Sequence, residues 1–80
     1  MMASDLELER EMRRRMRQEP WVSTQNILVR AERGVVSLQG LVDSEAERSA
    51  LATMARAIPG ARGVDVHLLH RRDALRHYAA

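Results

Sequence analysis

The chain has 80 residues and a formal net charge of +2, with thirteen arginines, no lysine and no cysteine. This length allows one domain with one core, the absence of cysteine excludes disulfides and zinc–thiolate sites, and the small net charge excludes a polycation. Folding at this size hides only about 60 to 65% of the chain's surface, so a partner that covers apolar surface would matter.

The N-terminal segment MMASDLELERE is acidic and lacks the charged-then-apolar order of a secretory signal. No apolar run is long enough to span a bilayer. The sequence as given therefore predicts a cytoplasmic protein, or a periplasmic one if a precursor segment was removed. Residues 1–3 are expected to be disordered.

The first predicted element is a helix over residues 4–18, which opens with Ser4 and Glu7 at the spacing of a capping box. Its apolar stripe consists of Leu8, Met12 and Met16. Its opposite face carries, among others, Arg13, Arg14 and Arg17. Acidic residues come early and arginines late, an order that suits the helix dipole and gives the arginines a local structural reason. Pro20 ends this helix.

An antiparallel hairpin is predicted next, from strands over residues 26–31 and 34–42. Apolar residues alternate in both strands. The second strand follows the pattern Gly-x-Val-x-Leu-x-Gly-x-Val from Gly34 to Val42. The turn between the strands is formed by residues 32–34.

The spacing of apolar residues then changes from that of a strand to that of a helix. Ser44 and Glu47 have capping-box spacing and predict a helix over residues 45–58, which the Pro-Gly pair at 59–60 ends. A last strand is expected over residues 64–69. The connection is long enough for a right-handed crossover, which makes the second and third strands parallel.

The order α-β-β-α-β predicts an α+β fold, a small three-stranded mixed sheet with two helices packed on one face. The predicted inner face of the sheet consists of Ile27, Val29, Val36, Leu38, Val66 and Leu68. The predicted helical side of the core consists of Met12, Met16, Leu51, Met54 and Ile58. The domain is expected over residues 4–69, followed by a polar tail over residues 70–80.

The other face of the sheet is predicted to be bare, because nothing in the chain is left to cover it. The candidate partner interface on this face consists of Leu28, Val35, Leu41, His67 and Leu69. If the aliphatic residues cluster, they form an apolar patch of the kind that marks an interface. The alternative is a solvated sheet face with scattered aliphatic residues.

A second candidate site is a membrane or phosphate contact formed by Arg13, Arg14, Arg17 and Trp21. A tryptophan ring next to guanidinium groups is typical of a peripheral membrane contact, with the ring at headgroup level and the arginines on phosphates. The alternative is that Trp21 half-buries against the helix end while the arginines form a solvated face, some paired with glutamates.

Catalytic and metal-binding patterns are not found in the sequence. His67 and His70 are expected to point to opposite faces, which does not make a metal site. The carboxylates near the second helix are explained by capping, so no enzyme and no cofactor are expected. Residues 60–63 spell the GxxG of a KH domain, but they should join a helix to a strand, and stacking aromatic residues are scarce. Nucleic acid is therefore not the expected partner.

The pattern from Gly34 to Val42 and the helix containing Arg48 resemble the BON domain, a module named for bacterial osmotic-stress and nodulation proteins. The resemblance covers Asp5 to Leu69. The family typically has Gly-Val directly after the second helix, whereas here residues 60–63 precede the last strand and make a longer turn.

The resemblance implies a non-enzymatic binding module, active in bacterial stress responses and proposed to bind phospholipid. We therefore expect weak association with anionic phospholipid surfaces or an envelope-linked partner. The alternative is a protein-interaction or self-association module that uses the open face of the sheet.

Overall fold

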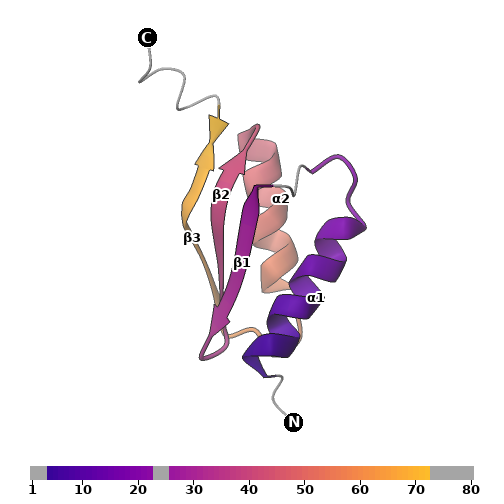
Figure 1. The fold of residues 1–80 in the computed structure, drawn as a ribbon, viewed down its shortest axis with the longest axis vertical. Coiled ribbons are helices and arrows are strands. Elements are labelled where there is room, and N and C mark those ends of the chain that lie inside the picture. Colours follow the sequence, from indigo (N-terminus) through magenta and orange to yellow (C-terminus); the bar gives the residue numbers. More distant parts are fainter. Residues whose placement is uncertain (1–3, 23–25, 73–80) are drawn as a thin grey trace.

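The computed structural model describes residues 4–22 and 26–72 (Figure 1). Its elements are α1 (Asp5–Arg17), β1 (Ile27–Glu32), β2 (Val35–Val42), α2 (Glu45–Arg56) and β3 (Gly63–Arg71). The strands form one sheet in the order β1-β2-β3, with β1 antiparallel and β3 parallel to β2. Figure 1 shows both helices on one side of this sheet, which confirms the predicted α+β fold.

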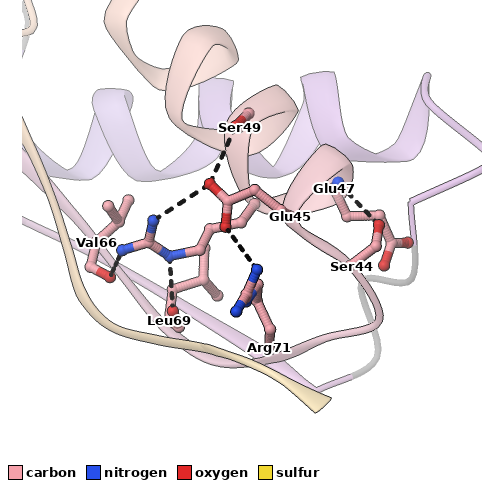
Figure 2. Close-up of polar contacts among 8 residues, drawn as sticks. Ser44, Glu45, Glu47, Ser49, Val66, Leu69 and Arg71 are labelled. Carbon is pink, nitrogen blue, oxygen red and sulfur yellow. Dashed lines mark hydrogen bonds and ion pairs between the residues drawn. The ribbon is translucent and has the colours of Figure 1, made fainter. Parts of the chain in front are cut away.

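Both helices begin next to the predicted capping serines. The Ser4 hydroxyl accepts the backbone N–H of Glu7 at 3.2 Å, and the Ser44 hydroxyl accepts that of Glu47 at 3.3 Å (Figure 2). The Glu47 carboxylate accepts the N–H of Asp43 at 2.6 Å. Caps of this kind satisfy amides that the helix leaves unpaired and stabilise it by about 1 kcal/mol each.

The hairpin turn between β1 and β2 is held by the first residue of α1. Arg33 and Gly34 have φ angles of 52° and 82°, the left-handed conformation of a type I′ turn. The Asp5 carboxylate accepts both of their N–H groups, each at 3.0 Å. The N-terminus of α1 and the hairpin are therefore fixed to one another.

The pairing of β2 with β3 contains a β-bulge. Ser37 pairs with Asp65 and Gln39 pairs with Leu68, so two steps along β2 match three steps along β3. The extra residue on β3 inverts the alternation of its side chains from that point onward.

Three predictions for β3 are wrong, the first two of them because of this bulge. Leu69 is only 1% exposed and belongs to the core, whereas Leu68 is 43% exposed, the reverse of the predicted order. His67 and His70 are both exposed, and they lie on the same open face rather than on opposite faces. The strand also continues to Arg71, past its predicted end.

The core lies between the helices and the inner face of the sheet. Its buried cluster consists of Leu8, Met12, Met16, Val22, Val29, Val36, Leu38, Val42, Leu51, Ala55, Ile58 and Leu69. Fully burying a large aliphatic side chain is worth about 1.5 to 3 kcal/mol, so this cluster supplies most of the driving force for folding. Within residues 4–22 and 26–72, no helix is both long enough and apolar enough to cross a membrane.

The outer edge of β1 is covered by polar side chains of α1. The Glu9 carboxylate accepts the N–H of Ala31 at 3.0 Å, and the Arg13 guanidinium donates to the carbonyl of Val29 at 3.1 Å. These groups occupy backbone positions that an added strand would use.

The outer strand on the other side, β3, is held by Arg48 of α2. Its guanidinium donates to the carbonyls of Leu69 at 3.0 Å and Val66 at 3.4 Å. Figure 2 shows the neighbouring Glu45, whose carboxylate lies 3.7 Å from Arg48 and 3.8 Å from Arg71. Side chains of the helices thus occupy two backbone groups on each edge strand of the sheet.

Candidate functional site

Four arginines form a ridge on the solvent face of α1. This arginine ridge consists of Arg10, Arg13, Arg14 and Arg17. Together with Glu7 and Glu11 they line one shallow surface hollow. The structure therefore brings together the three arginines predicted from the sequence and adds Arg10. The sequence signal for Arg10 was its spacing from the other three arginines, because residues three, four and seven apart share one face of a helix.

The arginines of the ridge differ in how far they are already engaged. Arg13 bonds to β1 and lies 3.8 Å from Glu9, and Arg14 donates two hydrogen bonds to Glu11. Arg10 and Arg17 have no hydrogen bond or ion pair within the described part of the chain. These two guanidinium groups are the ones available to an external anion.

Glu11 lies between two guanidinium groups on the flank of the ridge. The hydrogen bonds from Arg14 and Arg15 lower the pKa of its carboxyl group from 4.5 to about 2. The same contact with Glu11 raises the pKa of Arg14. Glu11 therefore stays ionised down to strongly acidic pH and neutralises part of the ridge.

We expect Glu11 to contribute to the acid sensitivity of the fold. Because its folded pKa is below its unfolded value, its stabilising contribution is complete above about pH 4.5 and is lost as pH falls towards 2. Urea unfolding of wild type and Glu11→Gln between pH 7 and pH 2 checks this. The stability gap between the two should shrink below about pH 4.5. A gap for Glu11→Gln that stays constant down to pH 2 contradicts the expectation.

Trp21 lies away from the ridge, against the outer side of α2. It is 55% exposed, and its indole N–H donates to Glu19 at 3.1 Å. The other residues lining its shallow hollow are Glu19, Ala46, Ser49, Ala50, Thr53 and Met54. The tryptophan and the arginines predicted as one site thus line two separate hollows. Val22, at 4% exposure, is the residue that anchors this segment in the core.

The open face of the sheet carries exposed apolar side chains between charged ones. Leu28, Val35 and Leu68 are among the exposed large hydrophobic residues. The predicted Leu41 and His67 also lie on this side, but Leu69 does not, because the bulge turns it into the core and replaces it with Leu68. The alternation predicted from sequence could not reveal this exchange.

Two charged residues, Arg30 and Asp65, lie in one row of the open face. Arg30 pairs with Ser37 on β2, and Ser37 pairs with Asp65 on β3. Asp65 accepts the ring and backbone N–H groups of His67, which lower the pKa of the Asp65 carboxyl. Arg30 has no hydrogen bond or ion pair within the described residues. The candidate interface predicted from the sequence did not include Arg30.

Potential metal ligands are not clustered in the described ranges, and the GxxG segment lies in a different context from that of a KH domain. No cluster of three or more potential metal ligands is found among residues 4–22 and 26–72. The GxxG segment at 60–63 joins α2 to β3, unlike the helix-to-helix loop of a KH domain. The N–H of Arg62 donates to the carbonyl of Gly34 at 2.7 Å, so this loop is docked on the hairpin turn.

Comparison with protein families gives a match to the BON domain over residues 4–71. The chain belongs to the BON domain family. The match spans every element from the Ser4 cap to the end of β3, and it confirms the resemblance seen in the sequence. BON domains are non-catalytic binding modules, often linked to phospholipid binding. No match was found among curated proteins.

Proposed function

We propose that this BON domain is a non-catalytic module that binds anionic phospholipid surfaces through the arginine ridge. The observation that carries the proposal is that Arg10 and Arg17 lie on one exposed helix face without a partner in the described chain. A guanidinium near an anionic bilayer is worth about 1 kcal/mol, so two such groups give weak binding. The attraction is screened within about 8 Å at physiological ionic strength, which makes the binding salt-sensitive.

Vesicle co-sedimentation tests this proposal. Wild-type protein should bind vesicles in proportion to their phosphatidylserine content at low salt and leave them at high salt. The double variant Arg10→Glu with Arg17→Glu should bind at least about tenfold more weakly. The matched control is Arg33→Glu with Arg56→Glu, which makes the same change in net charge away from the ridge. The absence of wild-type binding at low salt, or equal losses in both variants, contradicts the proposal.

Trp21 provides a second readout, because it is the only tryptophan in the chain. Its exposed ring suits the headgroup region of a bilayer, where tryptophan is enriched. A blue shift of its fluorescence on vesicle binding supports the predicted contact of Trp21 with lipid. An unchanged spectrum in fully bound protein means that the ridge makes the contact without Trp21.

The open face of the sheet supports a second candidate function, association with a protein, including an envelope-linked one. Both helices lie on the opposite side, and apolar residues such as Leu28 and Leu68 remain exposed. Exposed apolar side chains gathered on one face favour a binding role. Cytoplasmic location, or periplasmic location after removal of a precursor segment, stays a prediction.

A further inference from the structure

We infer that the open face of the sheet binds the same face of a second copy of the chain. The two-fold axis lies between the two faces and runs parallel to β2. This inference deepens the second candidate function and rests on the open face being a protein-binding surface. It is independent of lipid binding, because the arginine ridge lies on α1, on the other side of the sheet.

Partial cover of both sheet edges favours stacking of faces over strand addition as the route to self-association. Glu9 and Arg13 occupy backbone groups of β1, and Arg48 occupies two carbonyls of β3. A second copy cannot add a strand at these positions without displacing those side chains. Two exposed leucines, Leu28 and Leu68, and the unpartnered Arg30 are found on the open face instead.

The side chains on the axis are compatible with their own copies. A two-fold axis along β2 brings each outward side chain of that strand close to the same side chain of the second copy. The outward side chains of β2 are those of Val35, Ser37, Gln39 and Leu41. None is charged, and a hydroxyl or an amide can both donate to and accept from its copy. Two copies that face each other in this way therefore meet no charge repulsion along β2.

The side chains off the axis are complementary. The same rotation places β1 of one copy over β3 of the other. Residues that are register partners across the three strands form a row, and each row of one copy lies over the same row of the other. Arg30 and Asp65 occupy the same row on opposite outer strands, so Arg30 of each copy meets Asp65 of the other. Leu28 and Leu68 share the next row and meet in the same way. The face is thus complementary to itself, with two ion pairs and two apolar contacts.

The size of the face predicts weak association. Three strands about 4.8 Å apart and about 27 Å long give a footprint of about 400 Å² per copy. Stable interfaces usually bury about 800 Å² per partner. Because the face is smaller than a usual stable interface, the pairing is expected only at high protein concentration or where copies are locally concentrated.

Charge reversal and mixing test the arrangement by sedimentation equilibrium at low salt. Wild type should dimerise, and Arg30→Asp or Asp65→Arg alone should each weaken dimerisation by about tenfold, since each variant sets like charges against one another in both contacts. An equimolar mixture of the two variants should recover to within about threefold of wild type. In the mixed pair a carboxylate at position 30 faces a guanidinium at position 65, and native Arg30 faces native Asp65.

The matched control is Arg10→Asp, which reverses one charge on the ridge and should dimerise like wild type. Circular dichroism checks that every variant is folded. A wild type that stays monomeric across the concentration range overturns the inference, and so does a mixture that associates no better than its components. Failure of lipid binding is seen separately, in the vesicle assay with the ridge variants.

Discussion

Gly40→Ala is expected to destabilise the protein by at least about 3 kcal/mol, a large part of the roughly 4 to 12 kcal/mol expected for a chain of this length. Gly40 has a φ of 142°, a conformation that side chains rarely adopt. A Cβ at this position would lie 1.9 Å from the carbonyl oxygen of Asn26 and 3.2 Å from the Cα of Ile27. Because the obstacle is backbone, β1 must move away from β2 to admit the methyl group.

Gly63→Ala is the control for this substitution. A Cβ at Gly63 would meet only the Val35 side chain, at 3.9 Å, which is ordinary contact. The effect at Gly63 should stay within about 1 kcal/mol of wild type. Urea unfolding followed by circular dichroism measures both variants, and similar losses at the two glycines would show that the close approach at Gly40 is not as described.

Leu69→Ala is the second substitution with a large expected effect, a loss of about 2 to 5 kcal/mol. The Leu69 side chain is 1% exposed and belongs to the core cluster, so truncation leaves a cavity within that cluster. The same truncation one residue earlier, Leu68→Ala, should cost less than about 1 kcal/mol, because that side chain is 43% exposed.

This pair of leucines tests the bulge directly. A regular β3 would make Leu68 the buried residue and reverse the order of the two losses. The measurement is the urea unfolding midpoint of each single variant. The dependence of the unfolding free energy on urea concentration is compared with that of wild type to check that only stability has changed. A larger loss for Leu68→Ala than for Leu69→Ala contradicts the pairing of Gln39 with Leu68.

The arrangement of the fold was predictable because its signals are local. The capping serines, the alternation from Gly34 to Val42 and the four-residue spacing in α1 each depend only on near neighbours in the chain. The two glycines of that pattern have distinct reasons in the structure. Gly34 takes part in the left-handed turn, and Gly40 allows β1 to approach closely.

The parts that sequence reasoning missed depend on partners distant in the chain. The choice between Leu68 and Leu69 depends on where β3 gains a residue against β2, and both side chains are equally apolar. Trp21 was grouped with the arginines because it is near them in sequence, but it lines a hollow with residues of α2. Which arginines are free depends on the pairing of Glu11 with Arg14, which spacing alone does not decide.

Because the helices cover only one side of the sheet, the two proposed binding surfaces face in opposite directions. Two copies joined through their bare sheets would carry their α1 helices on opposite outer sides. A pair attached to one vesicle by one ridge would then hold its other ridge outward, towards a neighbouring bilayer. Concentrated protein would therefore tether vesicles to one another, whereas the dilute monomer would only coat them.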